Sequence, residues 1–135
     1  MWQGVFLILW IIFAHWVGDF VCQTHWQASN KSKNWNALAR HVVTYTLCMT
    51  ILIAPAIPGW HLLPTQGAGN RLAVFFAVTL VAHFVTDAIT SRITSRLYAK
   101  QDWHNFFVVV GFDQVLHYAQ LFATFAFIVG DSWPQ

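Results

Sequence analysis

The chain has 135 residues, of which 57% are hydrophobic and only 9% are charged, and its formal net charge is +2. Soluble domains carry about 25% charged residues, so these few charges could hardly cover a water-facing surface. The scattered basic residues also exclude a basic nucleic-acid-binding patch. The composition indicates an integral membrane protein that forms one domain over residues 1–135.

Four apolar segments are each long enough to cross a bilayer, which takes roughly 20 residues in a helix. Helices are expected because a helix satisfies its own backbone polar groups in hydrocarbon. We therefore predict an all-α, polytopic four-helix membrane bundle. Its spans are predicted at about residues 4–22, 39–57, 72–93 and 106–130.

The first segment differs from a signal peptide, because Met1–Gly4 carries no basic side chain and no small-residue cleavage site follows. A connection rich in proline and glycine, Ala54–Gly69, separates the second and third spans. Cys22 and Cys48 lie within or beside apolar runs, so we interpret them as small packing residues without a disulfide.

The basic residues predict the orientation of the spans. Six of the seven lie on one side: Lys31, Lys33, Arg40, Arg92, Arg96 and Lys100. The positive-inside rule puts this side in the cytoplasm and both chain termini on the extracytoplasmic side. Tryptophans are expected to anchor the two interfaces, with Trp2, Trp60 and Trp133 outside and Trp26, Trp35 and Trp103 inside.

A polar motif recurs inside the apolar segments: a histidine and an aspartate four residues apart, which therefore share a helix face. Random placement of the seven histidines and five aspartates would give roughly 0.5 such pairs. Three are present, namely His15 with Asp19, His83 with Asp87 and, in reverse order, Asp113 with His117.

All three pairs fall toward the cytoplasmic ends of their spans, and the reversed order in the fourth span is what antiparallel helices require. His41 lies in the first turn of the second span, at a similar depth, with Tyr45 one turn deeper. Ionisable groups inside a bilayer are costly and normally face the interior of the bundle. We therefore expect the pairs and His41 to form one layer.

Histidine nitrogen and carboxylate oxygen are ligands that zinc binds readily. We predict one or two divalent ions, most simply zinc, bound by His15, Asp19, His41, His83, Asp87, Asp113 and His117. Two other interpretations stay open: hydrogen-bonded pairs that join the helices, or a proton or ion pathway. The remaining histidines, His25, His61 and His104, are expected to be exposed or interfacial.

Groups suited to an anionic substrate surround the predicted layer, and we expect five to contact substrate: Gln23, Lys31, Ser91, Arg92 and Gln114. Lysine and arginine at this depth also reach lipid head groups without any specific site. In the functional interpretation, one or two of them hold a phosphate next to the metal.

The motifs HWVGDFVCQ, NKS, HVVTYTL, HFVTDAITSRITSRLY and FFVVVGFDQVLHYAQL together resemble a family of small bacterial and phage membrane proteins, the domain of unknown function 3307. The resemblance covers nearly the whole chain except Pro55–Asn70. It implies a multi-pass protein of the bacterial inner membrane, and it implies no activity. The family pattern matches His15, Asp19, Gln23, Lys31, His41, His83, Asp87, Ser91, Asp113, Gln114 and His117.

More loosely, the His/Asp-rich helices resemble membrane-bound metal-dependent hydrolases. We therefore expect a membrane-embedded hydrolase that acts near the cytoplasmic leaflet on an amphiphile such as a phosphoester lipid. Asp19, Asp87 and Asp113 are the candidate catalytic carboxylates, as ligands or as a general base. Membrane lipid is the expected partner, nucleic acid is not, and a homo-oligomer is compatible with the sequence.

Two other functions stay open. One is a proton or metal-ion transporter or channel, which would need a polar path that continues outward beyond His83; the outer halves of the first and fourth spans offer little of that. The other is a non-catalytic phage or bacterial membrane effector with a structural metal.

Overall fold

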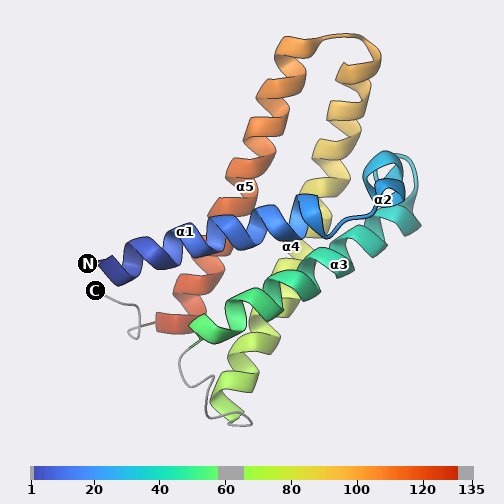
Figure 1. Cartoon of the computed structure of the whole chain (residues 1–135). Helices are drawn as coiled ribbons and strands as arrows, with labels where there is room; N and C mark the ends of the chain where they lie inside the picture. The colour runs from blue at the N-terminus through green and yellow to red at the C-terminus, as the bar shows by residue number, and fades with distance from the viewer. Residues whose placement is uncertain (1, 58–65, 131–135) are drawn as a thin grey trace.

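The structure, a computed structural model, describes residues 2–57 and 66–130 (Figure 1). These residues form only helices, turns and short connections, which confirms the predicted all-helical fold. The elements in chain order are α1 (Trp2–Trp16), a π-helical turn η1 (Val17–Val21), α2 (His25–Asn30), α3 (Trp35–Ile53), a 3-10 turn η2 (Ala54–Ala56), α4 (Gln66–Ala99) and α5 (Trp103–Val129).

Four helical stretches within the described residues are long and apolar enough to cross a membrane: Gly4–Val21, Trp35–Ala56, Gly67–Ala99 and Trp103–Val129. Each overlaps one predicted span, so the four predicted segments are confirmed. The third is longer than the predicted 72–93 because the chain stays helical from Gly67 and continues as a helix beyond Ile93 to Ala99. Hydroxyl groups near this end donate to carbonyls one turn back, as Ser91 does to Asp87 and Thr94 to Thr90, so these polar side chains are satisfied within the helix.

α4 and α5 form a long antiparallel hairpin, and α1 and α3 pack beside it (Figure 1). α3 contacts α4, and α1 contacts both α3 and α5. The start of α1 and the end of α5 lie at the same end of the molecule. At about 1.5 Å per residue, the 34 residues of α4 extend well beyond the roughly 30 Å of a bilayer core.

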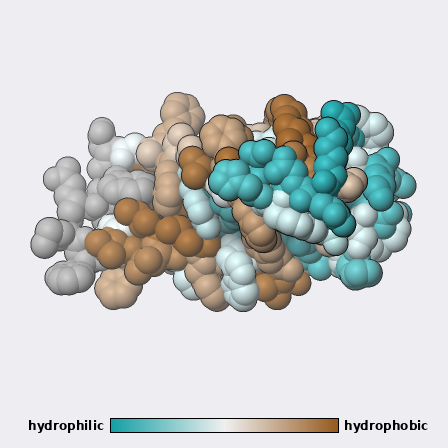
Figure 2. Space-filling model, turned by 90° about the horizontal axis from the view of Figure 1, so that it is seen from above, coloured by the Kyte–Doolittle hydropathy of each residue, from teal (hydrophilic) through white to brown (hydrophobic). Residues whose placement is uncertain are grey.

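The apolar core lies in the half of the molecule nearest the start of α1. It is built from all four long helices, with Ile11 of α1, Met49 of α3, Phe75 of α4 and Leu121 of α5 buried together. The outer faces are apolar too: Phe6 is 69% exposed and Phe127 80%. Figure 2 shows hydrophilic residues gathered at the end with α2, at the right of that view. An apolar surface next to this polar end suits helices that cross a membrane.

Helix α2 and the π-turn η1 are two local features that the sequence patterns did not predict. α2 was expected to be part of a connection, but Thr24 caps it: the Thr24 hydroxyl accepts from the Gln27 backbone, and the Gln27 side chain accepts from the Thr24 backbone. The π-turn η1 interrupts the first span at Gly18 and Asp19. Gly18 lies so close to Tyr45 that an added Cβ would stand 3.0 Å from Tyr45 Cδ2. Such π-turns often occur at functional sites.

Several predictions concern single side chains. The predicted interfacial residues Trp26, Trp35 and Trp103 are exposed, and so are His25 and His104. Trp60, Trp133 and His61 lie outside the described residues, as does the side chain of Trp2. Cys22 and Cys48 are free thiols, and their sulfur atoms contact each other at 3.2 Å.

Candidate metal site

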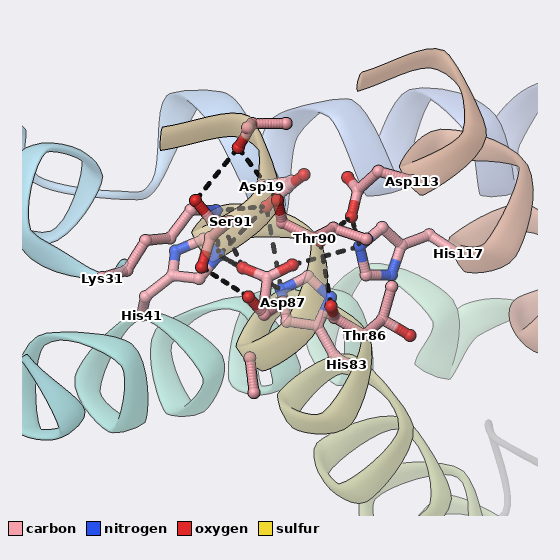
Figure 3. Close-up of polar contacts among 12 residues, drawn as sticks. Asp19, Lys31, His41, His83, Thr86, Asp87, Thr90, Ser91, Asp113 and His117 are labelled. Atoms are coloured by element: carbon pink, nitrogen blue, oxygen red, sulfur yellow. Dashed lines mark hydrogen bonds and ion pairs between the residues drawn. The ribbon is translucent and has the colours of Figure 1, made fainter. Parts of the chain in front are cut away.

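The four long helices bring polar side chains together at one level of the molecule (Figure 3). η1 supplies Asp19, α3 supplies His41, α4 supplies His83 and Asp87, and α5 supplies Asp113 and His117. These are six of the seven predicted ligands. They form two groups in which one nitrogen or oxygen atom from each residue lies within 4.8 Å of the others: Asp19, His41, His83 and Asp87 in the first, and Asp19, Asp113 and His117 in the second.

The first group is almost completely buried, and its ligand atoms converge. His41 Nε2 lies 3.1 Å from Asp19 Oδ1, 3.2 Å from Asp87 Oδ2 and 3.1 Å from His83 Nε2. His83 Nε2 lies 3.7 Å from each of the same two carboxylate oxygens. A tetrahedral zinc ion with bonds of about 2.0–2.1 Å separates its ligand atoms by roughly 3.3–3.4 Å. The measured separations bracket that value.

Hydrogen bonding alone does not satisfy this group. His41 Nε2 carries at most one proton, yet four polar atoms lie within 3.2 Å of it: Asp19 Oδ1, Asp87 Oδ2, His83 Nε2 and Lys31 Nζ. Asp19 Oδ1 is buried and accepts no hydrogen bond from the described residues. A divalent cation between the four ligand atoms of the group would contact all of them at once, so these residues fit a metal ion.

Asp87 connects the two groups. Its Oδ2 faces His41, while its Oδ1 lies 3.2 Å from His117 Nε2. His117 Nε2 is also 3.5 Å from Asp113 Oδ1. Asp19 belongs to both groups. A carboxylate that faces two ligand sets is the arrangement by which two ions about 3.5–4 Å apart are held in dinuclear sites.

His15 is the predicted ligand that the structure does not bring into either group. Its Nδ1 lies 2.8 Å from the Tyr45 hydroxyl and its Nε2 lies 3.0 Å from Gln114 Oε1. The amide oxygen only accepts, so Nε2 donates and Nδ1 accepts from the tyrosine. Both ring nitrogens are therefore used, although Asp19 Oδ2 is only 3.9 Å from Nε2. His15 acts here as a hydrogen-bonding residue that connects α1 to α3 and α5.

Hydrogen bonds from neighbouring residues orient the second group. Thr90 donates to Asp113 Oδ1 at 2.6 Å, and the Gln114 amide donates to Asp113 Oδ2 at 3.1 Å.

In the first group, the Tyr45 ring stacks on His83 with a centroid distance of 3.7 Å. The outer Nδ1 atoms of His41 and His83 have no partner among the described residues, whereas metal-bound histidines usually donate from that nitrogen.

Lys31, at the C-terminal end of α2, supplies a cation at the edge of the first group. Its Nζ lies 2.8 Å from Asp87 Oδ2 and 3.9 Å from Asp19 Oδ1. Burial disfavours the charged form, but the two carboxylates outweigh that effect and raise the pKa of Lys31 above its ordinary value. Lys31 is therefore protonated and partly neutralises two buried negative charges.

A pocket of about 150 Å³ opens beside these groups, between η1, α4 and α5. Of the predicted substrate residues, the structure places Gln23, Lys31, Ser91 and Gln114 in its wall, together with Asp19, Asp87 and Asp113. Arg92 is not in the wall. Its guanidinium lies 4.0 Å from the centre of the Trp35 ring and donates to the Ala88 carbonyl, so Arg92 connects α4 to α3 instead.

Sequence reasoning missed Thr90 and the role of Tyr45. Both positions carry a signal in retrospect: Thr90 follows Asp87 by three residues and Tyr45 follows His41 by four, so each shares a helix face with a predicted ligand. Hydroxyl groups on that face are suited to orient carboxylates and imidazoles.

Across the residues that the structure describes, fold and site together define an all-helical protein with four helices long and apolar enough to cross a membrane and a buried His/Asp group able to hold a metal ion. A family model described as protein of unknown function (DUF3307) matches residues 6–135, so the chain belongs to that family, and the resemblance inferred from the motifs is confirmed. No curated protein and no solved structure matches the chain.

Proposed function

We propose that this protein is a membrane-embedded, metal-dependent hydrolase that acts on a phosphoester amphiphile. The observation that carries the proposal is the convergence of Asp19, His41, His83 and Asp87 at tetrahedral spacing, beside a second group that shares Asp19. Four buried ionisable side chains are expensive in a membrane, and such groups normally serve a function. A pocket with three carboxylates and one lysine adjoins them.

The residues of this site can supply both the metal ligands and the general base that hydrolysis needs. Asp19, His41, His83 and Asp87 would hold one ion, and Asp113 and His117 a second, with zinc favoured by the mixture of nitrogen and oxygen ligands. Such an ion supplies Lewis acidity toward a phosphoryl oxygen and lowers the pKa of water. Asp113 is oriented by Thr90 and Gln114 and lines the pocket, so it is the best placed general base.

The membrane, in this proposal, is a bacterial cytoplasmic membrane, and the end of the molecule with α2 faces the cytoplasm. Six of the seven basic residues lie on that side of the spans. Single cysteines at Asn34 and Gln101, in a background without Cys22 and Cys48, should react with an impermeant maleimide only after permeabilisation. Cysteines at Trp60 and Trp133 should react in intact cells. The opposite labelling pattern would contradict the orientation.

Ion or proton transport is the second candidate, because buried polar side chains continue past the metal groups. Gln120 donates to Thr79 at 3.3 Å and to Thr124 at 3.0 Å, one to two turns beyond His83 and His117. Beyond them lies the apolar core, in which Phe75 and Phe125 are buried. We therefore place hydrolysis first.

The test uses purified full-length protein in nanodiscs, loaded with zinc, and a panel of phospholipids and isoprenoid phosphates. We expect phosphate or head-group release that stops on chelation and returns with zinc. An Asp113→Asn variant should keep the ion held by Asp19, His41, His83 and Asp87 and lose turnover, while His25→Ala, on the exposed face of α2, should keep both its metal and its turnover. A metal-loaded protein that hydrolyses nothing on the panel but moves zinc or protons across liposomes would replace hydrolysis by transport.

A further inference from the structure

A second pocket adjoins the first on the side of α2. It has a volume of about 470 Å³, within the range of small-molecule binding sites. One wall comes from the end of α2 and the following turn, residues 28–33, and the other from residues 91–98 of α4; Phe106 of α5 also lines the pocket. Lys31, Ser91 and Thr94 line both pockets, so the two spaces share a border. We call this space the α2–α4 pocket.

The two pockets have opposite chemistry. Three carboxylates line the first, which suits cations. The described residues that line the α2–α4 pocket include no carboxylate. Their polar side chains are two lysines and six hydroxyl-bearing residues: Ser29, Lys31, Ser32, Lys33, Ser91, Thr94, Ser95 and Tyr98. Lysine and hydroxyl groups that surround a ligand-sized space are suited to an anion rich in acceptor oxygens.

Donors in this pocket are available to a ligand. Within residues 2–57 and 66–130, the side chains of Ser32, Lys33 and Ser95 make no hydrogen bond or ion pair. Lys31 differs, because it already contacts Asp87 at the border. The pocket therefore has its own free cation and hydroxyls, and they do not belong to the metal groups.

The first pocket also has an apolar edge. Phe20 of η1 and Val110 of α5 line it, and Phe20 is half exposed on the outer face of the molecule. An amphiphile can place its apolar chain past these two residues, toward lipid, while its scissile group reaches the carboxylates. The part of the substrate on the other side of the scissile bond then extends past Lys31, which lines both pockets, into the α2–α4 pocket.

We propose that the α2–α4 pocket binds an anionic leaving group, and that the substrate is accordingly a lipid diphosphate. This inference rests on the proposed hydrolase function. In the reaction, the oxygen of water bonds to the inner phosphorus and the bridging P–O bond breaks. The outer phosphate leaves with the bridging oxygen, a lipid monophosphate remains, and the protons of water pass to the general base and the products. Lys33 and the hydroxyls stabilise the departing phosphate.

Binding and turnover are measured separately in the zinc-loaded, full-length protein in nanodiscs. The binding probes are farnesyl methylenediphosphonate, which resists hydrolysis, the matching farnesyl monophosphonate, and methylenediphosphonate without a chain. Lys33→Ala and Ser95→Ala alter the pocket, and Lys100→Ala, in the α4–α5 turn, is the matched control. Turnover is followed as release of inorganic phosphate from farnesyl diphosphate.

We expect Lys33→Ala to weaken binding of the farnesyl diphosphonate about tenfold, which is the value of a charge-assisted hydrogen bond, with little effect on the monophosphonate. Ser95→Ala should act in the same direction and Lys100→Ala should not. Chain-free diphosphonate should bind much more weakly. Equally tight binding without the chain would identify a soluble diphosphate as the ligand and overturn the lipid assignment.

The outcomes separate this inference from the proposed function. Hydrolysis of lipid monophosphates or phospholipids, with diphosphonate binding unaffected by Lys33→Ala and Ser95→Ala, would overturn the α2–α4 pocket as an anion site and leave the hydrolase standing. Lys33-dependent binding of farnesyl diphosphonate by a protein that hydrolyses no substrate would do the reverse: the anion site would stand and hydrolysis would fail.

Discussion

The same four helices build two regions of opposite character. Toward the start of α1 they bury the apolar core, with Ile11, Met49, Phe75 and Leu121; toward α2 they bury the His/Asp groups. In a membrane, an apolar core of this kind would gain mainly from close packing, because lipid tails are as apolar as the side chains themselves. The His/Asp groups lose hydration when they are buried, and only their ion pairs, hydrogen bonds or metal contacts offset that loss. The apolar core therefore determines how the helices pack, and the His/Asp groups indicate the function that this packing serves.

The largest expected effect follows from removing the carboxylate that connects both groups. Asp87→Asn should abolish tight metal binding and turnover, and lower the free energy of unfolding by about 3 kcal/mol, because Lys31, His41 and His117 lose their shared partner. Elemental analysis and unfolding in detergent measure both. Asp102→Asn is the control, since Asp102 only caps α5 and asparagine caps equally well. Full metal content in Asp87→Asn would contradict the site.

Two buried histidines sharpen the comparison further. His83→Ala should lose most of the bound metal, because His83 Nε2 belongs to the first group. His15→Ala should retain it, while lowering the free energy of unfolding by about 1–2 kcal/mol through the lost bonds to Tyr45 and Gln114. Metal content per chain distinguishes the two variants. Equal loss in both would return His15 to the ligand set.

The apolar core should respond in the opposite way. Leu121→Ala leaves a cavity among fully buried side chains, so it should lower the free energy of unfolding by about 2 kcal/mol. Metal content and the dependence of turnover on zinc should stay at the wild-type level. If Leu121→Ala released the metal while still folded, the two regions would not be independent.

The smallest effect is expected at the π-turn. An alanine Cβ at Gly18 would press on Tyr45, which is held by His15 and by its stacking on His83, so Gly18→Ala should destabilise by about 1 kcal/mol. Gly111→Ala in α5 meets no neighbouring atom and should stabilise by a similar amount through helix propensity. Thermal unfolding of both variants checks the sign. Stabilisation by Gly18→Ala would show that Tyr45 is not held.

Much of the fold and most of the candidate ligands could be predicted because their signals are local. Apolar length marks the spans, and four-residue spacing places Asp113 and His117 on one face. What failed depends on contacts between helices. Nothing in the spacing of His15 reveals that Tyr45 and Gln114, 30 and 99 residues away, use both its nitrogens. Arg92 likewise turns to Trp35 because α3 presents an aromatic face to α4.

The metal content of the purified protein tests the central claim most directly. Elemental analysis of full-length protein, after stringent washing and against an Asp87→Asn control, should find about one to two transition-metal ions per chain, with zinc predominant. Adding zinc to the stripped protein should raise the temperature of unfolding, because only the folded chain presents the converged ligands. Less than roughly 0.2 ions per chain, with no thermal shift on adding zinc, would contradict the account and leave the His/Asp groups as hydrogen-bonded contacts between helices.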